Sequence, residues 1–96
     1  CPGTAHCAEE RWESADPEAD FNRLSLLISD LPRSLIINQS ENYLHAEVSS
    51  AFFGFVDDLE LLTLDDGIQV RSISRLGDSD LGVNSQRLAV LRDGLS

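Results

Sequence analysis

A strand–turn–strand pattern in the second half of the chain constrains the fold more than any other feature. Residues 55–64 and 68–75 are rich in apolar and β-branched side chains that alternate with polar ones, as expected of half-buried strands. Between them stands Asp66-Gly67, a dipeptide typical of the tight turns that join antiparallel strands. These segments therefore predict an antiparallel hairpin.

Two registers are possible for this hairpin. If the Asp-Gly dipeptide forms the loop, Asp58 lies opposite Arg75. If the loop begins one residue earlier, Glu60 lies opposite Arg71. Either way the charged side chains share one face, and opposite charges across a strand pair contribute roughly 0.2–1 kcal/mol, so we interpret them first as structural ion pairs. The apolar side chains on the other face are Leu59, Leu61 and Val70.

Residues 16–31 predict an amphipathic helix. Asp16 is a favourable N-cap, Pro17 suits the first helical position, and Pro32 ends the segment. Apolar residues recur at three- and four-residue steps along one stripe, formed by Phe21, Leu24, Leu27, Ile28 and Leu31.

Strands are also expected at residues 34–39 and 43–49, and a second helix is expected to begin at Asn84 as its N-cap. Together these elements predict one α+β domain over residues 16–96: a four-stranded antiparallel sheet with an N-terminal and a C-terminal helix packed on one face. The strand side chains expected to face the helices are Leu35, Ile37, Leu44, Ala46, Val48, Leu59, Leu61 and Val70. The matching helix side chains are Leu24, Leu27, Leu88 and Leu91.

Residues 1–15 have no regular period and predict an irregular N-terminal arm. Trp12 either pins this arm onto the domain or serves as an exposed anchor for a partner. Cys1 and Cys7 are spaced for a small disulfide loop, which would suit an exported protein. Two free thiols, or a metal site that includes His6, are the alternatives; we predict the disulfide and no metal.

The charge balance narrows the range of partners. The formal net charge is −10, with seven arginines and no lysine. Nucleic acid and anionic lipid bind clustered positive charge, so this balance argues against both. No apolar run approaches the roughly 20 residues needed to span a bilayer. We expect a targeting segment to have preceded Cys1, in an exported or organellar protein.

Few residues are candidates for chemistry. Asp57 shares its strand face with apolar side chains, so it is either a general acid or base or a structural carboxylate satisfied by backbone donors, by a hydroxyl such as that of Ser74, or by an arginine. Arg71 and Arg75 project from one face and form an alternative clamp for a carboxylate or phosphate. The sequence contains no serine-nucleophile elbow and no phosphate-binding loop.

Three sequence blocks resemble the family catalogued as domain of unknown function 1499. They are residues 53–58 (Phe-Gly-Phe-Val-Asp-Asp), residues 71–75 (Arg-Ser-Ile-Ser-Arg) and residues 79–84 (Ser-Asp-Leu-Gly-Val-Asn), the last accompanied by Arg87. The resemblance covers residues 17–95 and departs from its relatives at Asp78, where they usually carry an aromatic residue. It implies an exported or organelle-targeted protein, in a periplasm or a thylakoid lumen, and no activity that can be carried over.

Three functions are consistent with this sequence. The first is a non-enzymatic protein-interaction module, an accessory or peripheral subunit of a larger membrane-associated assembly such as a photosynthetic one. Its candidate contacts are Trp12, Phe52 and Phe53. The second is a small-ligand carrier with a pocket between sheet and helices, and the third is an enzyme that uses Asp57 or the arginine pair. We predict a protein partner and no cofactor.

Overall fold

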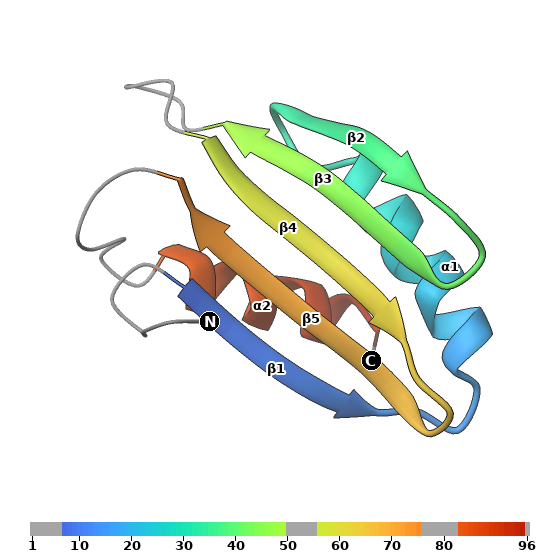
Figure 1. Ribbon diagram of the computed structural model, residues 1–96. Coiled ribbons are helices and arrows are strands. Elements are labelled where there is room, and N and C mark those ends of the chain that lie inside the picture. The colour runs from blue at the N-terminus through green and yellow to red at the C-terminus, as the bar shows by residue number, and fades with distance from the viewer. Residues whose placement is uncertain (1–6, 50–55, 76–82, 96) are drawn as a thin grey trace.

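The computed structural model describes residues 7–49, 56–75 and 83–95 of the chain. They form one antiparallel sheet in the strand order β1-β5-β4-β3-β2, together with two helices (Figure 1). The elements in chain order are β1 (Cys7–Glu13), α1 (Pro17–Ser29), β2 (Ser34–Gln39), β3 (Tyr43–Ser49), β4 (Val56–Thr63), β5 (Gly67–Ser74) and α2 (Val83–Gly94). The predicted α+β class and antiparallel sheet are confirmed, but the described sheet has five strands rather than four.

The additional strand is β1, which corrects the prediction of an irregular arm over residues 1–15. Cys7–Glu13 pairs along its whole length with β5, with Trp12 opposite Ile68. Only Cys7 and Trp12 are buried in this strand, so the sequence shows no period-two alternation. The partner strand lies about sixty residues further along the chain, and local sequence carries no signal of that pairing. As a consequence, α1 is an internal helix.

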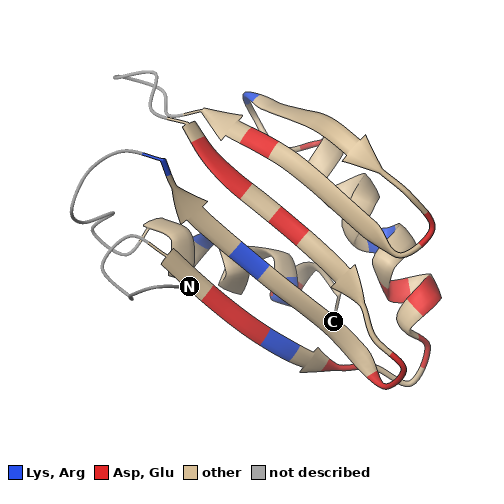
Figure 2. Cartoon of the chain, in the orientation of Figure 1, with Lys and Arg blue, Asp and Glu red and all other residues tan. Residues whose placement is uncertain are grey.

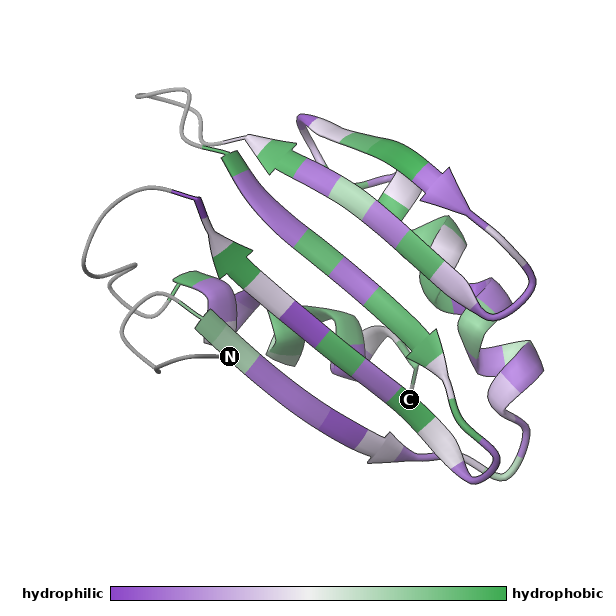
Figure 3. Ribbon diagram, viewed as in Figure 1, coloured by the Kyte–Doolittle hydropathy of each residue, from purple (hydrophilic) through white to green (hydrophobic). Residues whose placement is uncertain are grey.

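Both helices lie on the same face of the sheet, behind it in Figure 1. Hydropathy alternates along the central strands (Figure 3), because side chains alternate between the helix side and the open face. The Asp16 side chain accepts a hydrogen bond from the Ala19 N–H, as expected of an N-cap. The buried core consists of Trp12, Phe21, Leu24, Ile28, Leu44, Ala46, Val48, Leu59, Leu61, Ile68, Val70, Leu88 and Leu91.

The side chains of strand β2 alternate in the opposite sense to the one predicted, so that the residues expected to face the helices are exposed. Leu35 and Ile37 are 62% and 47% exposed, whereas Ile36 packs against the core. Three consecutive apolar residues fit either phase, so their pattern does not decide the orientation. The choice is made by Ser34, whose Oγ donates to the backbone carbonyls of Ile28 and Leu31 at the end of α1. This anchor turns Ser34 and Ile36 toward the helix side.

The β4–β5 hairpin adopts the second of the two registers. Glu60 lies opposite Arg71, and the Leu64 N–H donates to the Gly67 carbonyl across the Asp65-Asp66 loop. Gly67 is therefore the first residue of β5 rather than a loop residue. A Cβ atom at this position would lie 2.1 Å from the carbonyl oxygen of Trp12. Glycine is required here because the β1 backbone approaches so closely.

This contact makes Gly67→Ala a test of the β1–β5 pairing. The added methyl group forces the two backbones apart, and we expect a loss of roughly 1–3 kcal/mol in the free energy of unfolding, measured by urea denaturation. Gly94→Ala is the matched control, because a Cβ there meets only the flexible Leu27 side chain. We expect it to change stability by less than about 1 kcal/mol. Equal behaviour of the two variants would contradict the close approach of β1.

Candidate functional site

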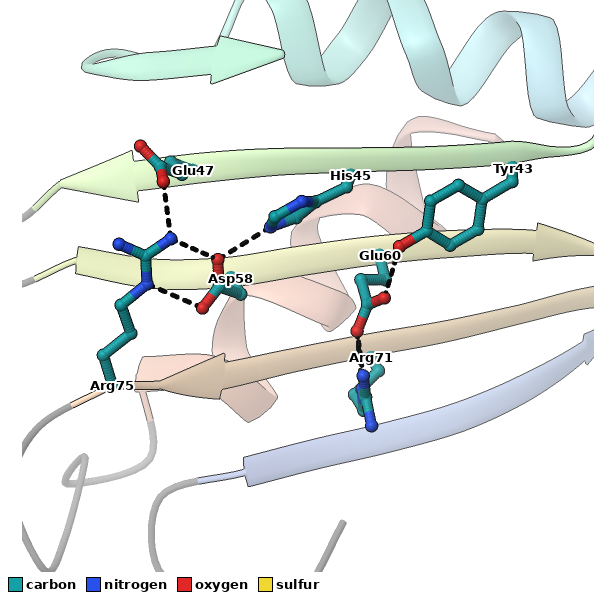
Figure 4. Close-up of polar contacts among 7 residues, drawn as sticks. All are labelled: Tyr43, His45, Glu47, Asp58, Glu60, Arg71 and Arg75. Carbon is teal, nitrogen blue, oxygen red and sulfur yellow. Dashed lines mark hydrogen bonds and ion pairs between the residues drawn. The ribbon is translucent and has the colours of Figure 1, made fainter. Parts of the chain in front are cut away.

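The sheet face that points away from the helices carries ordered rows of charged side chains. Figure 2 shows acidic residues on β1, β3 and β4 next to arginine on β5. The strand register places Glu47 opposite Asp58, and it places His45 and Arg71 on either side of Glu60. These residues form two polar clusters, drawn in Figure 4.

Asp58 is the centre of the first cluster. Arg75 holds it in a bidentate arrangement, with Nε 2.8 Å from Oδ2 and Nη2 2.8 Å from Oδ1. The same Nη2 atom also donates to Glu47, and His45 Nε2 lies 2.7 Å from Asp58 Oδ1. Arg75 reaches Asp58 diagonally, since the residue directly opposite Asp58 is Ile73. One guanidinium group thus bridges carboxylates on two adjacent strands.

Glu60 is the centre of the second cluster. Tyr43 Oη donates to its Oε2 atom, and Arg71 Nε donates to Oε1 over 2.9 Å. Arg71 Nη2 donates to the same Oε1 atom. Tyr43, Glu60 and Arg71 therefore link β3, β4 and β5 through side chains alone.

These contacts shift the ionisation of the groups that make them. The hydrogen bonds from Arg75 lower the pKa of Asp58 to about 2, against an opposing contribution from burial. The hydrogen bond to Glu60 raises the pKa of Tyr43 to about 12. Burial is the largest influence on Glu60 and acts to raise its pKa, but the bonds from Tyr43 and Arg71 outweigh it and the pKa is lowered. Each carboxylate is therefore held in its charged form.

Neither Arg71 nor Arg75 is an unpaired cation that would be free to clamp an anion. Both guanidinium groups already bind carboxylates of the same face. The hollow beside Tyr43, Glu60 and Arg71 measures about 160 Å³, well below the volume of a typical small-molecule site. On this face the charged residues act as cross-strand ties.

Asp57 points to the opposite side of the sheet, toward α2. Its Oδ2 atom accepts a hydrogen bond of 2.8 Å from Arg87 Nη1, and only 11% of the Asp57 side chain and 14% of the Arg87 side chain are exposed. The sequence predicted a hydroxyl or arginine partner for Asp57 but did not name Arg87. The resemblance to the family was the available signal, because Arg87 accompanies its last conserved-looking block.

A buried polar network surrounds this ion pair. Ser72 Oγ donates to Asn84 Oδ1 over 2.6 Å, and Arg87 Nη1 lies 2.9 Å from Ser72 Oγ and 3.0 Å from Asn84 Oδ1. Asn84 Nδ2 donates to Ser74 Oγ. The prediction that Asn84 is the N-cap is wrong, because Asn84 lies within α2, which is described from Val83. The Asn84 side chain instead joins the first turn of this helix to β5. Both Ser72 and Asn84 are fully buried.

A cleft of about 360 Å³ opens beside the Asp57–Arg87 pair. It lies between the segment that follows α1, the ends of β3 and β4 that adjoin it, and one side of α2. Its described lining is mostly apolar with a few charged groups, and consists of Leu31, Pro32, Arg33, Val48, Ser49, Asp57, Val83, Gln86, Arg87 and Val90. A volume in this range suits a small ligand.

The remaining predicted site residues fall into two groups. Trp12 is only 9% exposed, packs in the core and donates from Nε1 to Glu10, so it is not an exposed partner anchor. Cys7 is buried at the start of β1. Phe52, Phe53 and Cys1 lie outside the described residues, and the disulfide therefore stays a prediction.

Metal-binding and membrane-spanning features were also sought within the described ranges 7–49, 56–75 and 83–95. No group of three or more His, Cys, Asp or Glu side chains there is arranged to hold a metal ion. Neither described helix is both long and apolar enough to cross a bilayer.

The amino-acid sequence matches the model of a known protein family. A family model described as protein of unknown function (DUF1499) matches residues 5–95, and the chain belongs to this family. No curated protein and no solved structure matches the chain. The resemblance inferred from the three sequence blocks is thereby confirmed.

The depressed pKa of Asp58 predicts a pH-dependent contribution to stability. A carboxyl group whose pKa is lowered by folding stabilises the folded state at pH values above its unfolded-state pKa. For Asp58 this stabilisation is lost as the pH falls from 3.8 through about 2. At neutral pH, Asp58→Asn should therefore lower the free energy of unfolding by about 1–3 kcal/mol. The difference in the free energy of unfolding between parent and variant should shrink as Asp58 of the parent protein becomes protonated. Urea midpoints at a series of pH values test this, and a deficit that is constant down to pH about 2 would contradict it.

The buried Asp57–Arg87 pair predicts a larger effect. Arg87→Met leaves a buried carboxylate without its partner, and we expect a loss of about 3 kcal/mol in the free energy of unfolding. Arg92→Met is the control, because Arg92 is 54% exposed and pairs with Glu10 at the surface, where a loss below about 1 kcal/mol is expected. The double variant Asp57→Ala/Arg87→Met should recover part of the deficit. Equal losses at Arg87 and Arg92 would rule out a special role for the buried pair.

Proposed function

We propose that this protein is a non-enzymatic interaction module that takes up an extended segment of a partner protein along the free edge of β2. The observation that carries the proposal is that this edge carries neither a charged residue nor proline. Strand β2 ends the strand order, so no described strand pairs with its outer side. The proposed contact is thus β2, whereas the sequence had pointed to Trp12, Phe52 and Phe53.

The two edges of the sheet differ in a way that favours this proposal. Edge strands usually carry charged residues or proline that block further pairing. Strand β1 follows this rule with Glu9, Glu10, Arg11 and Glu13. Strand β2, with the sequence Ser-Leu-Ile-Ile-Asn-Gln, has no charge and no proline. A register shift between Ile36 and Asn38 is its only described irregularity.

Apolar side chains flank the β2 edge on both faces. Leu35 and Ile37 are exposed on the open face. On the helix side a groove of about 380 Å³ runs between α1 and β2, lined in part by Ile36 and by Leu26, which is 68% exposed. A strand added to β2 alternates its side chains, so it would cover both apolar areas at once. Main-chain hydrogen bonds would supply affinity, and these areas would supply specificity.

We further propose that the partner belongs to a larger membrane-associated assembly, which this chain joins as an accessory subunit in a periplasm or thylakoid lumen. The net charge of −10 supports a protein partner over nucleic acid or anionic lipid. The enzyme hypothesis is weaker than the interaction hypothesis, because Asp57, Arg71 and Arg75 are engaged in ion pairs.

The test places a photo-crosslinking amino acid at Ile37 in the native source and identifies the protein that it captures. Affinity for that purified protein is then measured for the parent, for Ile37→Lys and for Leu62→Lys. We expect Ile37→Lys to weaken binding by at least about tenfold, because it places an unpaired charge in the new strand pair.

Leu62→Lys introduces the same charge on the same open face, away from the edge, and should leave the affinity unchanged. The proposal fails if the crosslinked product contains only a second copy of this chain. It also fails if both variants bind the partner as the parent does.

A second candidate function, a small-ligand carrier, is supported by a separate observation. The cleft beside Asp57 and Arg87 combines apolar walls with charged groups, as ligand sites commonly do. The cleft adjoins the ends of β3 and β4 and one side of α2, which supports the proposal of a carrier with a pocket beside the sheet. The two functions use different surfaces and can be tested independently.

A further inference from the structure

We infer that the cleft between α2 and the segment that follows α1 binds a small anionic amphiphile, whose carboxylate is held by Arg87 and Arg33 and whose hydrocarbon part lies against the apolar wall. This inference rests on the second proposed function, the carrier, and names its ligand class. It does not depend on the β2 edge.

The guanidinium group of Arg87 has one committed nitrogen and two available ones. Nη1 makes all of its described hydrogen bonds, to Asp57, Ser72 and Asn84. Nε and Nη2 donate to none of the described residues. They are not sealed from solvent either, since among those residues Thr63 Oγ1 is the one side-chain polar atom both buried and unpartnered. Arg87 lines the cleft, and we take the Nε–Nη2 edge, which has no partner among the described residues, to be the part that a ligand there would meet.

That free edge has the geometry of a carboxylate receptor. Nε and Nη2 form a planar fork that matches the two oxygens of a carboxylate in a bidentate pair. The network on Nη1 fixes the plane of the group in advance, so little conformational entropy is lost when an anion binds. If the network served only to neutralise Asp57, there would be no need for Arg87 Nε and Nη2 to lack partners among the described residues.

A second cation lies on the opposite wall of the cleft. Arg33 donates from Nε to the carbonyl of Ser49 and forms no ion pair with any acidic residue in the described ranges. Its backbone has a positive φ of 58°, an uncommon conformation for a residue other than glycine. The charged residues of the described lining are Arg33, Arg87 and Asp57, so this part of the cleft carries a net positive charge in a protein whose total charge is −10. Charge complementarity therefore favours an anion.

The apolar part of the ligand is indicated by the face that α2 turns to the cleft. Val83, Arg87 and Val90 recur at helical spacing along this side, whereas Leu88 and Leu91 face the core. Val83 and Val90 are 45% and 56% exposed, and Leu31, Pro32 and Val48 continue the apolar wall. An arginine fork beside such a wall suits a short hydrocarbon chain that ends in a carboxylate. The overall charge disfavours a whole anionic membrane as the ligand.

Amide chemical shifts recorded during titration with octanoate, 1-octanol and acetate test the inference. We expect octanoate to perturb the amides of Ser49, Val83, Arg87 and Val90. Octanol, which lacks the charge, and acetate, which lacks the chain, should bind at least about tenfold more weakly. Equal binding of octanol and octanoate would overturn the inference, as would perturbations confined to another face or no binding of octanoate.

Three variants test the carboxylate contacts and the apolar wall of the cleft separately. Arg87→Lys keeps a positive charge beside Asp57 but loses the fork, and Arg33→Asn removes a charge while tolerating the positive φ. Val90→Asp places a carboxylate in the exposed wall. All three should weaken octanoate binding, by at least about tenfold for Arg87→Lys and Val90→Asp, whereas Ile37→Lys should bind as the parent does. Unchanged binding by Val90→Asp would overturn the inference and leave the β2-edge proposal intact.

Discussion

The pairing of β4 with β5 is the interaction on which the rest of the structure depends. Its register places Glu60 opposite Arg71 and directs Leu59, Leu61 and Val70 into the core. A shift of the pairing by a single position, unlike the change by two that relates the alternative registers, would turn one strand over and place its charged side chains on the helix side. The same two strands offer Asp57 and Ser72 to α2. Helix, core and surface charges thus all follow from one strand pair.

The two faces of the sheet carry different kinds of ion pairs. On the open face, Asp58 and Glu60 are partly exposed, and they bind Arg75, which directly follows β5, and Arg71 of β5. These pairs relieve charge repulsion within an acidic protein. On the helix side, Asp57 and Arg87 are nearly buried, and Ser72 and Asn84 add hydrogen bonds to the same Arg87 nitrogen that binds Asp57, which helps the structure to tolerate the buried pair. The first set ties strands together, and the second joins a helix to the sheet.

The surfaces proposed for binding are those that the ion pairs leave free. The β2 edge has no charged residue along its length and exposes Leu35 and Ile37. The cleft uses the side of Arg87 that Asp57 does not occupy. A partner strand on β2 and an amphiphile in the cleft would contact different segments, since the β2 groove includes Leu26 of α1 whereas the cleft begins at Leu31, after the end of that helix. Both are therefore compatible within one molecule.

Local sequence determined much of this protein. The cap at Asp16 and the apolar stripe after it specify α1, strict alternation specifies β3 and the hairpin, and short blocks indicate the family. Only the tertiary structure decided the features that depend on distant partners. The fifth strand exists because β5 offers an edge to Cys7–Glu13, and Gly67 allows the two backbones to meet. The phase of β2 depends on the bonds of Ser34 to the end of α1, and the partner of Asp57 comes from a helix thirty residues away. Caps and periodicity act within a few residues, whereas these contacts form only when separate segments are packed together, which is why no pattern in the sequence could choose among them.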